Sequence, residues 1–161
     1  MSHQLTQNTK LLQKAILLVD NQVLLLKRSQ TSQTRPGKWD LPGGNSEWPN
    51  VLDDIKNPHE LDLLREIKEE TNLEVDSYWQ ERHQPLALST YFEGQKQVFS
   101  VIVIWLIPVQ KEVMSLVSLS HEHEDFQWVE LNKLSEFDFG FAGEPGGFIF
   151  EAFSRLSVKS Q

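Results

Sequence analysis

The segment from Asn57 to Leu73 constrains the fold most, because helix signals stand at both of its ends. Asn57 is a favourable N-cap residue, and Pro58 suits the first helical position, where a missing N–H costs little. Glu60 follows three residues after Asn57, as in a capping box. Asn72 can adopt the left-handed conformation that ends a helix. We therefore predict a helix over this segment.

The predicted helix has two chemically different faces. At about 100° per residue, four carboxylates share one arc of about 100°, namely Asp62, Glu66, Glu69 and Glu70. Aliphatic residues expected to face the core fill the next arc, namely Leu61, Leu63, Leu64 and Ile67. Like charges at this spacing destabilise a helix, and clustered oxygen ligands suit Mg²⁺ or Mn²⁺. The alternative is an acidic face in contact with water only.

Apolar runs of strand length surround this helix. The predicted strands are 11–19, 23–26, 39–41, 75–79, 86–92, 98–107 and 126–129. We also predict a short helix over 131–137, a glycine-rich loop over 140–147 and a closing helix over 148–156. Strands that precede and flank one strong helix favour an α/β fold with a mixed sheet. Residues 1–9 form a predicted flexible tail, and residues 45–56 an irregular loop.

Composition limits the class of protein. A chain of 161 residues corresponds to about one domain, so we expect a single domain over 1–161. Its net charge of −8 argues against non-specific binding to nucleic acid or anionic membrane. The chain has no Cys, which excludes disulfides and thiolate catalysis, and its longest apolar run is far shorter than the roughly 20 residues of a membrane span. We expect a cytoplasmic protein.

Two motifs together carry a family resemblance. The turn Leu41-Pro42-Gly43-Gly44 precedes the helix, and the helix contains Arg65-Glu66-Ile67-Lys68-Glu69-Glu70-Thr71-Asn72-Leu73. They resemble the box of the Nudix hydrolase family: a Gly, five residues, a Glu, seven residues, then Arg-Glu-U-x-Glu-Glu-x-Gly-U, where U is aliphatic. The resemblance extends from the first strand to Phe153 and implies a Nudix-type α/β/α sandwich with a mixed sheet.

The chain departs from that box in three places. Gly44 and Arg65 lie seven residues further apart than the pattern specifies, so the loop over 45–56 carries an insertion. Asn57 stands where the box has its first Glu, and Asn72 replaces the final Gly. Glu47 and Glu60 are the carboxylates that could replace the missing Glu.

The resemblance implies a metal-dependent reaction. Water attacks phosphorus and cleaves a phosphoanhydride bond in a nucleoside diphosphate-type substrate, while Mg²⁺, or alternatively Mn²⁺, neutralises the developing charge. It assigns Glu66, Glu69 and Glu70 as catalytic metal ligands, one of them a possible general base, and adds the Gly43 carbonyl as a ligand. Arg65 is expected to orient these carboxylates, the alternative being an ordinary ion pair one helical turn away.

A second acidic segment, Glu122 to Val129, resembles another Nudix segment, Glu-His-x-x-aromatic-x-Trp-Val. The resemblance makes Glu122 a further candidate catalytic carboxylate, against the alternative of a hydrated loop. His121 and His123 form a weaker candidate for a zinc pair, because two His without Cys are a poor signal.

Two substrate-binding residues are also expected. Arg28 resembles a family position that contacts substrate phosphate, and an arginine fork suits phosphate; a surface salt bridge is the alternative. Gly44 allows the backbone to approach a ligand closely. Trp48, in the inserted loop, is a candidate lid residue.

The missing box Glu at Asn57 motivates a rival function, a catalytically impaired Nudix-fold module that senses a nucleotide. An acidic scaffold without a small-molecule site is a third interpretation. The sequence leaves open the substrate, which of the glutamates is the base, and the oligomeric state.

Overall fold

A computed structural model describes residues 8–50 and 52–159, so the predicted tail over 1–9 lies mostly outside the described residues. In chain order the elements are β1 (Thr9–Val19), β2 (Gln22–Arg28), β3 (Trp39–Asp40), α1 (Pro58–Thr71), α2 (Asp76–Arg82), β4 (Gln84–Glu93), β5 (Val98–Pro108), η1 (Lys111–Leu116), β6 (His123–Glu130), η2 (Leu131–Glu136), η3 (Gly140–Gly143) and α3 (Phe148–Lys159). Within the described chain, no helix has the length and apolar character needed to cross a membrane.

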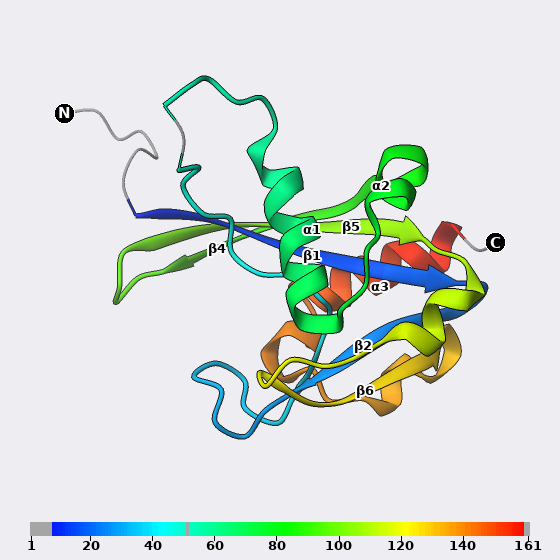
Figure 1. The fold of residues 1–161 in the computed structure, drawn as a ribbon. Coiled ribbons are helices and arrows are strands. Elements are labelled where there is room, and N and C mark those ends of the chain that lie inside the picture. Colours follow the sequence, from blue (N-terminus) through cyan, green and yellow to red (C-terminus); the bar gives the residue numbers. More distant parts are fainter. Residues whose placement is uncertain (1–7, 51, 160–161) are drawn as a thin grey trace.

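The strands form one mixed sheet in the order β3-β2-β1-β5-β4, and β6 also pairs with β2. The β1–β5 pair is parallel, and the other pairs are antiparallel. β1 and β2 pair only beside their connecting turn, where Leu18 faces Val23 and Val19 faces Gln22. Beyond this point the two strands diverge, so β1, β5 and β4 separate from β2 and β6 (Figure 1).

The chain after β3 runs along the part of β1 that β2 leaves unpaired. The Ala15 N–H donates to the Pro42 carbonyl at 2.8 Å, and the Gln13 N–H donates to the Gly44 carbonyl at 2.9 Å. This pairing fixes the Gly-Gly turn against the middle of β1. It therefore brings the turn beside Lys14, which lies between the two paired residues.

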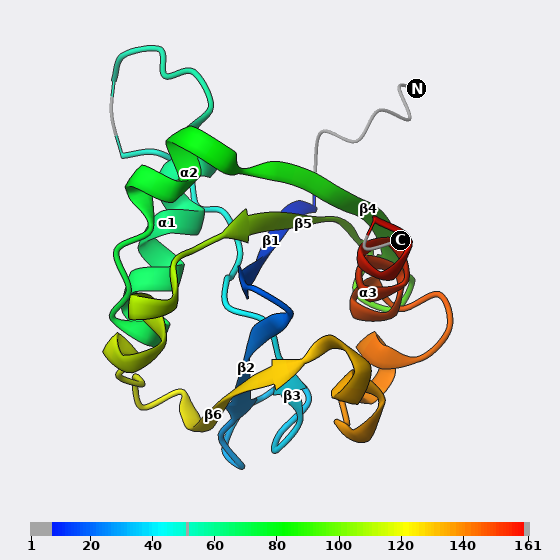
Figure 2. The same ribbon diagram turned by 90° about the vertical axis from the view of Figure 1, so that its right-hand side faces the viewer.

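Two hydrophobic clusters lie on opposite faces of the sheet. Ile16 of β1 packs with residues of η2, η3 and α3, whereas Ala15 and Leu17 pack with residues of α1, α2 and η1. Figure 2 shows α1 and α2 on one side of the strands and α3 on the other. Successive side chains of β1 thus enter clusters on alternate faces of the sheet, and helices cover both faces. The expected α/β/α sandwich is confirmed.

One predicted strand, over 75–79, is wrong, because this segment leads into α2. Val75 and Trp79 are buried, whereas Ser77 between them is exposed. A half-buried strand would bury every second residue, but a spacing of four is the spacing of a helix. The burial pattern therefore follows the helical period.

The start of α1 also differs from the expected capping box. Asn57 has a left-handed backbone (φ 53°) and makes no side-chain cap, although its carbonyl accepts the Glu60 N–H at 3.1 Å. Leu61 is expected in the core but is 66% exposed. At about 100° per residue, it lies roughly 120° or more around the helix from the buried Leu63 and Ile67. The predicted end is confirmed: Asn72 is left-handed (φ 61°), and its N–H bonds to the Lys68 carbonyl.

Candidate active site

The acidic face of α1 extends from solvent into the protein interior. Leu63 and Ile67 are fully buried and fix the helix against the sheet. This packing leaves the Glu69 side chain 60% exposed, the Glu66 side chain mostly covered and Glu70 buried. The three glutamates expected to bind metal therefore lie in three different environments.

Glu70 is the most deeply placed of these carboxylates, with a residue exposure of 6%. Its Oε2 accepts the Gly43 N–H at 2.8 Å. Burial raises the pKa of Glu70 to about 7, although the Lys14 ammonium and the Gly43 N–H oppose that rise. Burial also raises the pKa of Glu66, against the effect of Arg65. Both carboxylates have lost hydration that a metal ion could compensate.

The two turn glycines are required for different reasons. Gly43 has φ +126°, and a Cβ there would lie 2.3 Å from the Gln13 carbonyl oxygen. At Gly44 a Cβ would lie 2.4 Å from the Glu66 Oε2. Gly44, expected to approach a substrate, thus lies directly against a candidate metal ligand.

Arg65 is surrounded by four carboxylates. Its guanidinium lies 3.0 Å from Glu66, 3.1 Å from Glu69, 3.6 Å from Asp62 and 3.8 Å from Glu47. This arrangement suits the expected orienting role, and it brings Glu47 from the inserted loop to the edge of the acidic face. Because these pairs are partly exposed, their individual contributions to stability are small.

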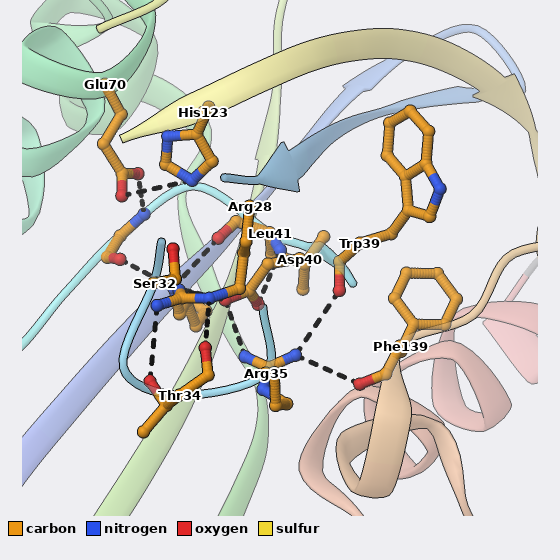
Figure 3. A network of polar contacts seen from close by, with 12 residues as sticks. Arg28, Ser32, Thr34, Arg35, Trp39, Asp40, Leu41, Glu70, His123 and Phe139 are labelled. Atoms are coloured by element: carbon orange, nitrogen blue, oxygen red, sulfur yellow. Dashed lines mark hydrogen bonds and ion pairs between the residues drawn. The ribbon is translucent and has the colours of Figure 1, made fainter. Parts of the chain in front are cut away.

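A second charged cluster surrounds Asp40, which is completely buried (Figure 3). Its Oδ2 lies 2.6 Å from Arg35, 3.1 Å from Lys14 and 3.2 Å from Arg28. Burial alone would raise the pKa of Asp40, but the charges of Lys14, Arg35 and Arg28, with the Leu41 N–H, lower it instead. Sequence reasoning missed Lys14, Arg35 and Asp40 as parts of one cluster, although a Lys and an Asp within strand segments were available as signals.

Arg28 is the most exposed cation of the Asp40 cluster, with about a fifth of its side chain accessible. Its Nε donates to the Thr34 carbonyl at 2.7 Å, and its Nη2 donates to the Thr34 hydroxyl at 3.3 Å. These bonds fix the guanidinium at the end of β2, paired in register with His123. Arg28 is thus ordered and accessible, as a phosphate-binding residue would need to be.

His123, rather than Glu122, lies beside the buried glutamate. Its Nε2 is 3.8 Å from the Glu70 Oε1 (Figure 3). Burial, reinforced by Lys14, lowers the pKa of His123 to about 4, so at pH 7 this contact is not a charged ion pair. Glu122 is exposed before β6, where its N–H donates to the Ser120 hydroxyl and its carbonyl accepts the Ser29 N–H. His121 is also exposed, so the two histidines lie in different environments.

The donor set suits a hard divalent cation but does not form a ready cage. Over residues 8–50 and 52–159, no three His, Asp or Glu side chains are grouped closely enough to hold a metal ion. Arg65 pairs with Glu66 and Glu69 instead. Glu70 is the residue that best suits a cation, because it is a dehydrated carboxylate that accepts a hydrogen bond from the Gly43 N–H. A bound cation would therefore have to draw the glutamates away from their present partners.

Comparisons with known proteins agree with this geometry. The family model described as NUDIX domain matches residues 13–146. The nucleoside triphosphatase NudI of Escherichia fergusonii is 28% identical over 127 residues, covering 76% of this chain and 83% of the relative.

Solved structures share the fold. A MutT protein from Methanosarcina mazei has a TM-score of 0.66 at 23% identity, covering 98% of this chain and 99% of the other. The NUDIX domain of Shewanella oneidensis NrtR, solved with ADP ribose, has a TM-score of 0.66 at 18% identity, covering 98% and 94%. The NUDIX family cleaves pyrophosphate bonds in nucleotide-type substrates. Since the family model spans most of the chain, this protein belongs to the family and is a Nudix hydrolase.

Proposed function

We propose that this chain hydrolyses a phosphoanhydride bond of a nucleoside diphosphate-type substrate with the help of Mg²⁺ or Mn²⁺. The observation that carries the proposal is the contact of Glu70 with the Gly43 N–H, because it joins the Gly-Gly turn to the acidic helix at a buried carboxylate. When bound, the metal ion would stabilise the charge that develops on the phosphate oxygens.

The chain's own residues have distinct roles in this proposal. Glu66, Glu69 and Glu70 would hold the metal, and the Gly43 carbonyl, which now accepts a hydrogen bond from Lys14, would join them as a ligand. Arg65 would orient Glu66 and Glu69. An ionised glutamate that is not fully occupied by the metal would accept a proton from the attacking water.

The proposal assigns substrate recognition to the opposite side of the turn. Arg28 would bind a substrate phosphate, because its guanidinium is partly accessible and fixed by Asp40 and Thr34. The Asp40 cluster has a net positive charge, because three cations (Lys14, Arg28 and Arg35) surround one carboxylate. Positive charge here suits the phosphate groups of a substrate. Glu122 remains a candidate proton acceptor only if its loop moves toward the helix.

A substrate panel with site variants tests this proposal. Nucleoside triphosphates and ADP-ribose, suggested by the names of the two relatives, are incubated with Mg²⁺ and then Mn²⁺. Released phosphate, pyrophosphate and nucleoside monophosphate identify the bond that is cleaved. We expect turnover that needs the divalent ion and falls at least about 100-fold in Glu70→Gln, because a neutral amide is a poor ligand for a hard cation. Full activity of that variant would refute the site assignment.

The second candidate is a binding module that is catalytically impaired. It is favoured by Asn57, which leaves the box without its first Glu, and by Arg65, which already engages two candidate ligands. Tight binding of ADP-ribose or a nucleoside triphosphate without product, at saturating Mg²⁺ or Mn²⁺, would support this function over hydrolysis. Glu47→Gln is a useful comparison, since Glu47 is the carboxylate of the inserted loop that approaches the helix.

A further inference from the structure

Lys14 places a buried ammonium group inside the candidate active site. The Lys14 side chain is 4% exposed, although it belongs to a strand of the central sheet. Its Nζ donates to the Asp40 Oδ2 at 3.1 Å, to the Leu41 carbonyl at 3.1 Å and to the Gly43 carbonyl at 2.7 Å. An ammonium has three N–H donors, so these bonds use all of them. Lys14 has no donor left for a substrate phosphate.

Gly43 connects this ammonium to the carboxylates of α1. Its carbonyl accepts from Lys14, and its N–H donates to the Glu70 Oε2 at 2.8 Å. The positive charge of Lys14 also acts on Glu70 and Glu66, where it opposes the effect of burial. Lys14 therefore already supplies part of the positive charge that a divalent cation would bring to the same groups.

Asp40 does not depend on Lys14 alone. Arg35 and Arg28 lie 2.6 Å and 3.2 Å from the same Oδ2. Loss of the Lys14 charge would leave Asp40 with two guanidinium partners. Among these three cations, only Lys14 donates to the Leu41 and Gly43 carbonyls, and only the Gly43 bond reaches the residue that also contacts Glu70.

We propose that Lys14 is a resident cation that competes with the divalent metal ion for the Gly43 carbonyl and the neighbouring glutamates, and so weakens metal binding at this site. The inference rests on the proposed metal-dependent function. Two cations close together in a partly dehydrated site repel each other strongly. The Gly43 carbonyl has two lone pairs, so it is the repulsion between the cations that we expect to lengthen the bond between Lys14 and Gly43 when the metal binds. Lys14 acts here as a positioning residue and does not touch the substrate.

The test measures metal binding without substrate. Mn²⁺ is titrated into the 161-residue protein at pH 8, and free Mn²⁺ is followed by electron paramagnetic resonance. Lys14→Met keeps a long unbranched side chain and removes the charge. Arg28→Met is the matched control, because Arg28 contacts the same Asp40 oxygen but has no hydrogen bond to Gly43. We expect Lys14→Met to bind Mn²⁺ about tenfold more tightly and Arg28→Met to change the affinity by less than about threefold.

Equal or weaker Mn²⁺ binding by folded Lys14→Met would overturn the inference. Equal tightening in both variants would also overturn it, because net charge alone would then explain the effect. If the wild-type protein and Lys14→Met both fail to bind Mn²⁺, the proposed metal-dependent function itself is wrong.

A measurement on the wild-type protein covers the case in which Lys14→Met does not fold. Mg²⁺ is added to isotopically labelled protein, and the Gly43 carbonyl and the Lys14 ε-methylene signals are followed by NMR. We expect both signals to shift together as the metal binds. Shifts at the Glu66 and Glu70 carboxylates without a change at Gly43 and Lys14 would overturn the inference.

Discussion

The buried carboxylate of Glu70 makes the stability of the metal-free protein depend on pH. Its pKa is raised from 4.5 to about 7, chiefly by burial. The folded state therefore keeps this proton in a pH range where the unfolded chain has lost it. Stability contributed by the protonated form is fully present below pH 4.5 and is lost as the pH rises to about 7.

The expected magnitude follows from the size of the shift. One pKa unit corresponds to about 1.4 kcal/mol, so ionised Glu70 costs the folded state up to about 3 kcal/mol above pH 7. Glu70→Gln removes this cost, because the amide is neutral and its oxygen can still accept the Gly43 N–H. For a chain of this size, that corresponds to a rise in Tm of roughly 6–12 °C at pH 8.

The assay is thermal unfolding of both proteins in a chelating buffer between pH 5 and pH 8. The Tm difference between Glu70→Gln and the wild type should grow as the pH rises. Glu69→Gln is the control, because the Glu69 side chain is mostly exposed. In a separate buffer without chelator, saturating Mn²⁺ at pH 8 should raise the Tm of the wild type much more than that of Glu70→Gln.

A Tm difference that is independent of pH, or that grows on acidification, would refute this reasoning. It would mean that the Glu70 carboxylate is hydrated or paired with a cation in the metal-free protein. If Glu69→Gln gained as much Tm with rising pH as Glu70→Gln, the effect would come from the general charge of α1 and not from the burial of Glu70.

Three further outcomes are expected. Asp40→Asn leaves three buried or partly buried cations without their shared carboxylate, so urea unfolding should show a loss of about 3–5 kcal/mol. Gly43→Ala places a Cβ 2.3 Å from the Gln13 carbonyl oxygen at φ +126°, so the variant should lose at least about 1–3 kcal/mol of stability together with metal-dependent turnover. Leu63→Ala should cost about 2–5 kcal/mol, whereas Leu61→Ala, at an exposed position of the same helix, should stay within about 0.5 kcal/mol in the same unfolding assay.

Much of the fold could be predicted because the signals were local. The period of the apolar residues identified α1, and the long apolar runs identified β1 and β5. The segment 75–79 was short enough to fit either period, and the exposure of Ser77 between the buried Val75 and Trp79 is what distinguishes helix from strand. Asn57 failed as a side-chain cap because its backbone is left-handed, which residue type alone does not reveal.

The site was harder to predict, because it depends on contacts between distant segments. The acidic stripe of α1 was visible as a pattern, but nothing in that pattern showed that Glu70 is buried and Glu69 exposed. His123 reaches Glu70 only because β6 pairs with β2. Lys14 meets Gly43 only because β1 and β2 diverge and the turn pairs with β1 in the space between them.

A crystal structure with bound Mn²⁺ at pH 8 tests the central claim most directly. The account predicts an anomalous scattering peak within coordination distance of the Glu66 and Glu70 carboxylates, with Arg65 moved away from at least one of its present partners. Mn²⁺ bound elsewhere in a protein that still shows metal-dependent turnover would contradict it.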